Sequence, residues 1–467
     1  MTAGPPGPAA AADPDLRVVT SWPVILAGRR GRLLIGMTLT ELVVAVQILI
    51  VVTVLPAVVH QLGGIRLYGL ALSVAAIAGI GSAPLAVRLL DRFGARLVVP
   101  AGALVFTCGA LGAGLADRMT VLVAARFFEG AGAAALGAVA VSGIAALYEE
   151  PQRPKVLVLG NLAWVMPSVA GPALGSLAVA TVGWRWAFTA QLPLLAVAMV
   201  LVAPGLGLLK PRPGGLADGP GRGVVGPSLL LLAGLLAVLA GPAEGGPAGI
   251  VVAVSGGALA VASVRRIMPR GMLTMRPGLP VATMALFCCA FAFFAVDGFV
   301  PLLLTAVDGR SVAVAGIVVT LAVLGWTLGG ILQARLARRG WTPPRLVAAG
   351  GALIVTGVAG TAIGLLPGAW LAPYLAWTVG GLGMGLAYSG AWLAVMAAQQ
   401  AGGGEASGLA GPLVADRMGT ALGAGAGGVC IAVATRAGLG VGSGIGIGLA
   451  VAVAGAVAIA IAARRMA

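Results

Sequence analysis

The chain has 467 residues, of which 60% are hydrophobic and only 9% are charged, and its mean hydropathy is +1.06. This composition lies outside the range of soluble globular proteins and indicates a protein with many membrane-spanning helices. The net charge of +15 does not indicate nucleic-acid binding, because the basic residues concentrate in alternate loops between apolar segments.

Apolar segments long enough to cross a bilayer recur from residue 33 almost to the last residue. Residues 1–32 have no continuous apolar core, so we expect a flexible cytoplasmic tail there and no signal peptide. Six segments then predict an N-terminal bundle over residues 33–209, with helices at 33–60, 67–88, 97–116, 120–148, 155–181 and 184–209.

The central linker, residues 210–278, contains two shorter apolar pieces, 228–240 and 247–264. The first piece covers only about 20 Å of a roughly 30 Å hydrocarbon core. We predict that both pieces span the membrane, giving fourteen helices; twelve spans with a surface or re-entrant hairpin is the alternative. A C-terminal bundle over residues 279–467 completes an all-α integral membrane protein, with helices at 279–306, 312–333, 345–366, 369–397, 406–434 and 439–462.

The positions of the basic residues predict which side of the membrane each terminus faces. With the termini in the cytoplasm, 22 of the 29 Lys and Arg residues lie on the cytoplasmic side, five lie outside, and Arg126 and Arg417 lie within spans. Cytoplasmic loops carry the excess of positive charge in membrane proteins. We therefore expect both the N-terminus and the C-terminus to be cytoplasmic.

The two predicted bundles resemble each other in sequence. ARLVVPAGALVFTCGALGAGL, from Ala95, aligns without gaps with PRLVAAGGALIVTGVAGTAIGL from Pro344, and ARFFEGAGAAALG, from Ala125, aligns with AWTVGGLGMGLAYSG from Ala376. Parallel repeats are typical of secondary transporters that place a substrate site between two bundles. Chance similarity of Gly- and Ala-rich helices is the alternative, but the matched loops and order favour two six-helix repeats.

Arg126 and Glu129 are charged residues within the fourth predicted span. Charge inside a span costs at least a few kcal/mol, so such residues usually face a cavity or a partner. Their spacing of three places them on one helical face, where they can neutralise each other. Two hypotheses remain open: Glu129 carries a proton whose affinity Arg126 sets, or the two residues form a static ion pair that braces the helix.

An aromatic stripe occupies the first helix of the second bundle. Phe287, Phe291, Phe294 and Asp297 follow a spacing of four, three and three, which predicts that they share one helical face. An aromatic stripe that ends in a carboxylate suits an amphipathic substrate, including a cation, through stacking and cation–π contacts. Packing against lipid or a neighbouring helix is the alternative for the rings.

The loop after the second span, VRLLDRFGARL, resembles the G-x-L-x-D-R-x-G-R-R loop of the major facilitator superfamily. Four residues match the motif: Asp91, Arg92, Gly94 and Arg96. Val87 and Ala95 depart from it. In this family the loop latches the two bundles together on the cytoplasmic side, and the resemblance implies the same role for the four matching residues.

Two further spans resemble motifs of proton-coupled exporters in this family. RFFEGAGAA resembles the R-x-x-Q-G-x-G-A-A motif of helix 4, with Glu129 in place of Gln. The fifth span resembles the G-x-x-x-G-P-x-x-G-G motif associated with antiporters, with Ser176 at the last Gly. The resemblance implies a hinge at Pro167, Gly171, Pro172 and Gly175. A helix that is kinked only for packing fits the same residues.

The sixth span provides the most specific resemblance. GWRWAFTAQLP, residues 183–193, resembles the G-W-R-W-x-F-x-x-N-x-P signature of the fourteen-helix drug:proton antiporter branch, with Gln191 for Asn. The principal matching residues are Trp184, Arg185, Trp186 and Phe188. Residues 404–425 also resemble helix 13 of that branch.

The first span departs most from the branch, which usually has L-D-x-T-I-V-N-V-A-L-P there. Alignment on Pro56 puts Gln47 where the branch has Asp. Because Gln cannot carry a proton, Glu41, Glu129 and Asp297 remain as candidate proton sites, with Arg126 as the neighbouring cation. We expect the substrate cavity to be lined by Gln47, Phe287, Phe291, Phe294, Asp297 and Arg417.

The resemblance implies a multi-pass transporter of the bacterial cell membrane that exports amphipathic small molecules or drugs by alternating access, in exchange for protons. An uptake symporter, or a lipid or metabolite transporter on the same scaffold, is the alternative. We expect no enzyme activity, since neither an H-E-x-x-H metal site nor a nucleophile with a base occurs. The expected partners are the substrate, protons and lipid, with no nucleic acid, metal or cofactor, and we expect a monomer driven by the proton gradient.

Overall fold

The structure is a computed structural model that describes residues 22–149, 152–209, 223–401 and 410–466. Every regular element in this part of the chain is helical, as predicted. Thirteen segments are long and apolar enough to cross a membrane, and both linker helices are among them. The helix α7 (Arg153–Thr181), whose side chains are only partly described, is not one of the thirteen, and its 29 residues make it a fourteenth long helix.

The N-terminal bundle begins with a short helix, α2 (Trp22–Ile25). Its remaining helices are α3 (Gly28–Leu62), α4 (Tyr68–Phe93), α5 (Ala95–Gly114), α6 (Met119–Leu147), α7, α8 (Arg185–Thr189) and α9 (Leu192–Val202). Two short turns, η1 (Ile65–Leu67) and η2 (Ala203–Leu208), lie before α4 and after α9. Residues 22–32 of the expected tail are thus largely helical, and residues 1–21 lie outside the described residues.

The central linker forms two helices, α10 (Val225–Glu244) and α11 (Gly246–Ile267), which pack against each other. α10 is longer than the apolar piece 228–240, because the flanking residues, including Pro242, are also helical. Its 20 residues cover about 30 Å, which is enough to cross the hydrocarbon core. α10 also contacts α4 and α17, one helix from each bundle.

The C-terminal bundle starts with α12 (Leu279–Asp297), which ends at the carboxylate of the aromatic stripe. The chain continues after Gly298 into the short α13 (Val300–Leu302) and the π-turn η4 (Leu303–Val307). The remaining long helices are α14 (Val312–Arg338), α15 (Pro343–Ala362), α16 (Ala372–Ala401), α17 (Ala410–Arg436) and α18 (Val441–Met466), with the turn η5 (Ile363–Leu365) after α15.

The two bundles repeat the same helix packing. α6 packs against α4 and α5, and α16 packs against α14 and α15. A Cβ on Gly130 of α6 would lie 2.0 Å from the carbonyl oxygen of Ala75, and one on Gly381 of α16 would lie 2.0 Å from that of Ala322. Because Gly130 and Gly381 are aligned in the sequence repeats, these matching close approaches confirm the repeat in three dimensions.

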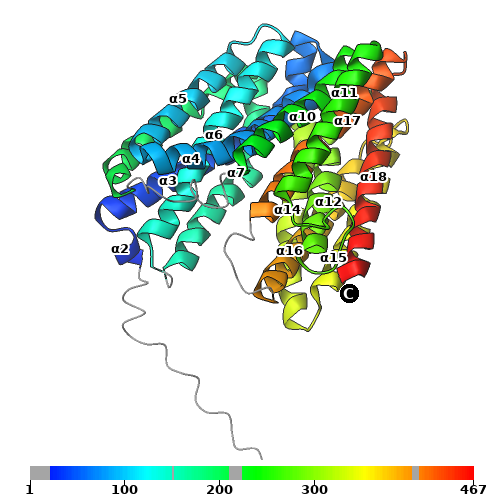
Figure 1. The fold of residues 1–467 in the computed structure, drawn as a ribbon. Coiled ribbons are helices and arrows are strands. Elements are labelled where there is room, and N and C mark those ends of the chain that lie inside the picture. Colours follow the sequence, from blue (N-terminus) through cyan, green and yellow to red (C-terminus); the bar gives the residue numbers. More distant parts are fainter. Residues whose placement is uncertain (1–21, 150–151, 210–222, 402–409, 467) are drawn as a thin grey trace, which may run out of the picture.

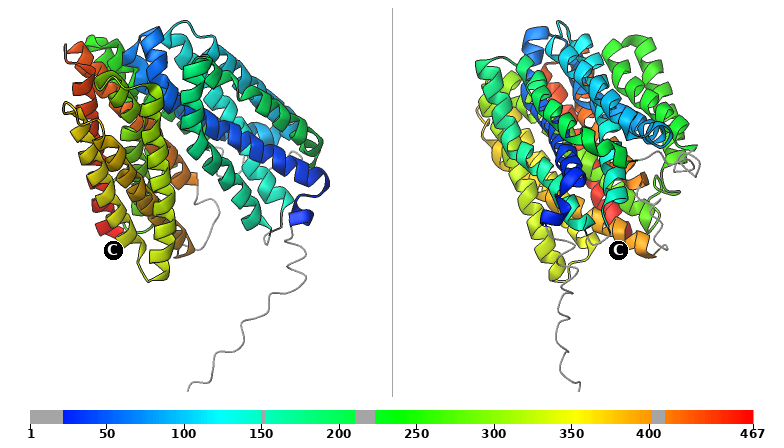
Figure 2. Two further views of the ribbon diagram at one scale, coloured as in Figure 1. Left: turned by 180° about the vertical axis from the view of Figure 1, so that it is seen from behind. Right: turned by 90° about the vertical axis from the view of Figure 1, so that its left-hand side faces the viewer.

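The bundles meet at one end and diverge toward the end where the C-terminus lies (Figure 1, Figure 2). At the closed end, the Tyr68 hydroxyl of α4 donates a 3.1 Å hydrogen bond to the carbonyl oxygen of Gly298. Beside this bond, a Cβ on Gly69 would lie 2.6 Å from the Cα of Gly428 on α17, so the two helices touch through backbone. These contacts join the N-terminal bundle to the C-terminal bundle at the closed end.

Candidate functional site

The pair singled out in α6 forms a buried ion pair. Arg126 Nη1 lies 2.6 Å from Glu129 Oε2, and the two side chains are 2% and 0% exposed. Gln47 of α3 donates a second hydrogen bond, 2.8 Å long, from Nε2 to the same oxygen. The spacing within α6 predicts the Arg–Glu contact, whereas the Gln47 contact joins residues 82 positions apart.

Two polar atoms of this triad have no hydrogen-bond partner among the described residues. They are Glu129 Oε1 and Arg126 Nε, and both are buried. Buried polar atoms are nearly always hydrogen-bonded, so each such exception marks a place where a water, an ion or a proton can act. Glu129 Oε1 is the atom that can take a proton without loss of either existing bond, because both donors use Oε2.

A glycine on α5 makes room for the triad. A Cβ on Gly109 would lie 2.5 Å from the backbone nitrogen of Glu129 and 2.9 Å from its Cγ. Such distances are too short for any side chain, so α5 can approach the ion pair only through Gly109. The pair is therefore enclosed by α3, α5 and α6 inside the N-terminal bundle.

We expect Gly109→Ala to lower the stability of the protein by about 1–3 kcal/mol, since an added methyl group in a tight helix contact forces the backbone apart. The measurement is the apparent midpoint of thermal unfolding in detergent. Gly160→Ala in α7 is the matched control, because a Cβ there would meet no atom within 4 Å. Equal midpoints for the two variants would contradict the close contact of α5 with Glu129.

Glu41 does not join this triad. It lies on α3, partly buried, and its Oε1 is 3.8 Å from the place of a Cβ on Gly137. Gly137 is eight residues beyond Glu129 along α6, which is about 12 Å nearer the diverging end. The structure thus separates two of the candidate proton sites, Glu41 and Glu129, along the same pair of helices.

The carboxylate of α12 has a different kind of partner. Asp297 is 4% exposed, and the indole Nε1 of Trp377 donates a 2.9 Å hydrogen bond to its Oδ1. The Trp377 ring stacks on Phe293, with centroids 4.9 Å apart and planes at 21°. Trp377 is not among the residues predicted from the sequence, although the repeat alignment places it opposite Arg126 and could have drawn attention to it.

The aromatic stripe divides into two groups. Phe287 and Phe291 stack on each other with centroids 6.0 Å apart, and a Cβ on Gly455 of α18 would lie 2.7 Å from the Phe291 ring. The Phe291 ring therefore lies next to α18. Phe294 is on the same face of the continuous helix α12, and its ring centroid lies 6.4 Å from that of Trp326 on α14.

The remaining cavity candidates lie apart from one another. Gln47 is bonded to Glu129 in the N-terminal bundle, so it does not lie with the aromatic rings of α12. Arg417 is exposed on α17, next to Asp416, which in turn lies beside the Tyr388 hydroxyl of α16. Residues 404–409 of the helix 13 motif lie outside the described residues.

The four expected latch residues lie at the diverging end. Gly94 has a φ of 77°, which allows the sharp turn from α4 into α5. The Arg92 guanidinium lies 5.1 Å from the centre of the Phe93 ring, and that of Arg96 lies next to Gly207 of η2. Asp91 Oδ2 is buried without a hydrogen-bond partner among the described residues. The structure places these groups against their own bundle, where the bundles diverge.

The residues of the expected hinge belong to α7, which remains a continuous helix from Arg153 to Thr181. A Cβ on Gly175 would lie 2.9 Å from Cγ1 of Ile50, so this glycine allows α7 to pack closely on α3. Gly171 and Pro167 are buried on the same helix, and the side chain of Pro172 lies outside the described residues.

At the closed end, side chains of the sixth-span signature, residues 183–193, form hydrogen bonds that connect the ends of neighbouring helices. Trp184 Nε1 donates a 2.5 Å hydrogen bond to Oε1 of Gln61 at the end of α3. Arg185 donates to the same oxygen and to the carbonyl oxygen of Ala116, each at 3.2 Å, and its guanidinium stacks on Trp184. Phe188 is buried against Trp184, and Trp186 is 56% exposed.

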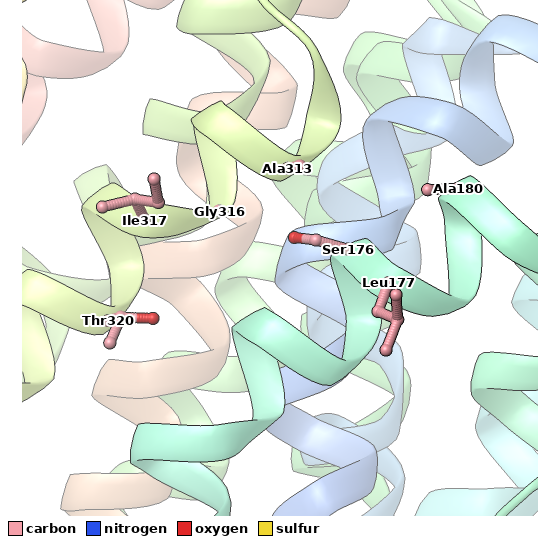
Figure 3. Close-up of a pocket in the computed structure, with 7 residues that line it drawn as sticks. All are labelled: Ser176, Leu177, Ala180, Ala313, Gly316, Ile317 and Thr320. Atoms are coloured by element: carbon pink, nitrogen blue, oxygen red, sulfur yellow. The ribbon is translucent and has the colours of Figure 1, made fainter.

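A groove of about 330 Å³ lies between α7 and α14, where the two bundles meet at the closed end (Figure 3). Ser176 Oγ donates a 3.4 Å hydrogen bond across this seam to the carbonyl oxygen of Val312. Exposed Leu177 and Ile317 flank the groove, as Figure 3 shows. The lining is mostly apolar, and its residues are Ser176, Leu177, Ala180, Ala313, Gly316, Ile317 and Thr320.

Comparisons with known proteins agree with this architecture. The model of a family described as Major Facilitator Superfamily matches residues 37–424. The multidrug transporter protein MdtP of Bacillus subtilis is 28% identical over 178 residues, which are 38% of this chain and 33% of that protein. The multidrug resistance protein B homolog of Mycobacterium tuberculosis is 28% identical over 348 residues, 71% of this chain and 64% of that protein.

A solved structure of an auto-inhibited peptide transporter of the POT family shares the fold. It superposes with a TM-score of 0.61 at 16% identity and covers 93% of this chain and 97% of that one. The helical bundles and their parallel repeats have the architecture that is typical of multi-pass secondary transporters. The chain belongs to the major facilitator superfamily. It spans between a third and two thirds of the length of the two curated relatives named above.

Proposed function

We propose that the protein exports amphipathic small molecules from a bacterial cell in exchange for protons, and that Glu129 carries the proton. The observation that supports this proposal most is the burial of Glu129 in a span, bonded to Arg126 and Gln47, with Oε1 lacking a described partner. The names of the multidrug-transporter relatives support drug-like substrates. The proton gradient supplies the energy, so the exchange needs no cofactor.

Protonation of Glu129 leaves the buried positive charge of Arg126 without its neutralising partner. A proton on Oε1 removes the negative charge that neutralises the guanidinium, while the hydrogen bonds to Oε2 can persist. An uncompensated buried charge costs about 3–5 kcal/mol. Since 1.4 kcal/mol changes a population ratio tenfold, protonation can shift the balance between two conformations by about two to three and a half orders of magnitude. The ion pair can therefore convert proton binding into a change of conformation.

We assign the diverging end to the cytoplasm. Arg88, Arg338 and Arg464 lie among the many exposed basic residues at the helix ends there. Few basic residues, among them Arg118 and Arg436, lie at the closed end. By the distribution of positive charge in membrane proteins, the diverging end faces the cytoplasm and the described conformation is inward-facing. The contacts described for Arg92 and Arg96 lie within their own bundle, as an open latch requires.

Purified protein in proteoliposomes, with an imposed pH gradient and an internal pH dye, tests the exchange. We expect at least one compound from a panel of lipophilic cations and neutral drugs to elicit proton flux. Export predicts that inverted vesicles accumulate the compound when their interior is acidic. Compounds that bind without any proton flux would contradict the proposal, and accumulation in right-side-out vesicles with an acidic exterior would favour the uptake symporter.

A further inference from the structure

The two linker helices pack against each other as one unit. A Cβ on Gly234 of α10 would lie 2.7 Å from the carbonyl oxygen of Gly256 on α11, and one on Gly241 would lie 2.9 Å from the backbone nitrogen of Ala253. Neither glycine has room for a side chain, so the two helices touch through backbone at two levels. Small residues allow such close helix contacts in membranes. We therefore expect the hairpin of α10 and α11 to move as a single body.

The hairpin is attached to the C-terminal bundle at the closed end. The guanidinium of Arg436, at the end of α17, donates hydrogen bonds to the carbonyl oxygens of Ala243 and Glu244. These carbonyl groups belong to the last turn of α10 and have no partner inside the helix. A cation at a helix C-terminus is also electrostatically favourable. Beside this cap, a Cβ on Gly425 of α17 would lie 2.6 Å from Cδ2 of Leu239, so the leucine side chain occupies the space over that glycine.

The turn between α11 and α12 attaches the hairpin to the same bundle at the diverging end. Met272 in this turn is 2% exposed. A Cβ on Gly411 of α17 would lie 2.9 Å from Cδ of Pro269. Arg465 of α18 donates a 2.7 Å hydrogen bond from Nη1 to the carbonyl oxygen of Thr274. The hairpin is thus attached to the C-terminal bundle near both ends of the spans.

The contact of α10 with the N-terminal bundle is a leucine seated on a glycine. A Cβ on Gly81 of α4 would lie 2.6 Å from Cβ and 3.0 Å from Cγ of Leu232. Leu232 is 12 residues before Glu244 at the end of α10, which is about 18 Å along the helix toward the diverging end. Gly81 is likewise 13 residues, or about 20 Å, from Tyr68 at the closed end. α10 therefore contacts α4 well away from the point at which Arg436 attaches it to α17 (Figure 1).

A helix attached to both bundles resists a change in the angle between them. In alternating access, one bundle rotates relative to the other. α10 is one continuous helix, and its C-terminal end follows α17 through Arg436. The contact of Leu232 with Gly81 must therefore shift when the bundles rotate. Because packed helix interfaces have discrete arrangements and do not deform continuously, this contact is fully formed in only one conformation.

We propose that α10 is a strap that stabilises the described conformation. Arg436 fixes its C-terminal end to the C-terminal bundle, and Leu232 seated on Gly81 holds the N-terminal bundle against it. The strap must release α4 before the closed end can open. A contact made in only one conformation shifts the population toward that conformation. This inference requires only that the two ends open alternately, and it depends neither on Glu129 as the proton carrier nor on the identity of the substrate.

Gly81→Ala is the first test. The added methyl group collides with Leu232, so we expect the ratio of the two conformations to shift by about tenfold toward opening of the closed end. The measurement is hydrogen–deuterium exchange of the full chain in detergent, read by mass spectrometry. Exchange should rise in residues 64–72 at the closed end and fall in residues 88–97 at the diverging end. Gly79→Ala is the matched control on the same helix, because a Cβ there would have no neighbour nearer than 3.8 Å.

Arg436→Ala tests the other attachment of the strap. Removal of the guanidinium frees the end of α10, so we expect exchange to change in the same directions as in Gly81→Ala. A strap is released by the loss of either attachment, and the double variant should therefore shift exchange no further than the larger of the two single changes. Independent contacts at this separation would instead have additive effects. Arg118→Ala, at an exposed arginine of the closed end, is the control and should leave exchange unchanged.

Three results would overturn the proposal. Higher exchange at both ends in Gly81→Ala would show a loss of stability without a change of conformation. Additive effects of Gly81→Ala and Arg436→Ala would show that the two contacts act separately, and exchange equal to that of the controls would show that they do not hold the bundles. If Gly81→Ala does not fold, Leu232→Ala takes its place, because it removes the seated side chain without adding volume, and the same opposite changes at the two ends are expected.

Discussion

Glu129→Gln is expected to abolish substrate-driven proton flux, with a loss of at least about a hundredfold, because an amide cannot exchange a proton in this range of pH. The replacement keeps the shape of the side chain and an oxygen for Arg126, so it corresponds to the permanently protonated state. Flux is measured with an internal pH dye in proteoliposomes. Flux at the wild-type rate would show that Arg126 and Glu129 form only a structural pair and that coupling lies elsewhere.

The double variant Gln47→Glu with Glu129→Gln is the matched control. The two side chains already share a 2.8 Å hydrogen bond, so the exchange moves the carboxylate from α6 to α3 without changing either volume. Arg126 keeps a negative charge within reach. We expect this double variant to regain a substantial part of the flux that Glu129→Gln loses. Restored folding without restored flux would indicate that the proton must bind on α6 itself.

Arg126→Met is expected to destabilise the protein strongly, by about 3–5 kcal/mol, since it leaves the Glu129 carboxylate buried without its cation. Met has a similar length and no charge, so packing changes little. The measurement is the apparent midpoint of thermal unfolding in detergent at neutral pH. Adding Glu129→Gln to Arg126→Met removes the uncompensated charge, and we expect this second change to recover most of the lost stability.

Recovery of stability in the double variant would identify the uncompensated charge of Glu129 as the cause of the destabilisation by Arg126→Met. Residues in one ion pair show non-additive changes in stability, whereas independent residues add. If the losses of stability caused by Arg126→Met and Glu129→Gln simply add in the double variant, the two groups do not interact in the folded protein. That result would contradict the buried ion pair. The double variant could instead show strongly non-additive stability together with normal transport. The ion pair would then have a purely structural role.

The described conformation suits an exporter before substrate release. The closed end is held by the Tyr68 bond to Gly298, immediately after Asp297, while the bundles diverge at the end we assign to the cytoplasm. In an exporter, this contact must break when the outer end opens. The groove between Ser176 and Gly316 lies on the same seam and changes shape in any rocking of the bundles.

Several features could be predicted from the sequence because they depend on local pattern. Hydropathy predicts the spans, with the exception of the full length of α10, whose helix extends into flanking polar and Gly-rich residues. The repeat alignment predicts the two bundles, and Gly130 and Gly381 confirm it. The contact of Arg126 with Glu129 follows from their spacing, since helical geometry alone brings residues three apart onto one face.

The partners that give these residues a function could be found only in the tertiary structure. Gln47 reaches Glu129, Trp377 reaches Asp297 and Gln61 reaches Trp184 across 82, 80 and 123 positions of the chain. Periodicity tells which face a residue occupies, but it does not tell which helix lies opposite that face. In this protein that choice depends on close helix contacts at small residues such as Gly109. The sequence by itself thus determined the spans, the repeats and the local ion pair, whereas helix packing alone decided that Gln47 reaches the acid of that pair and that the other buried acid, Asp297, meets a neutral indole.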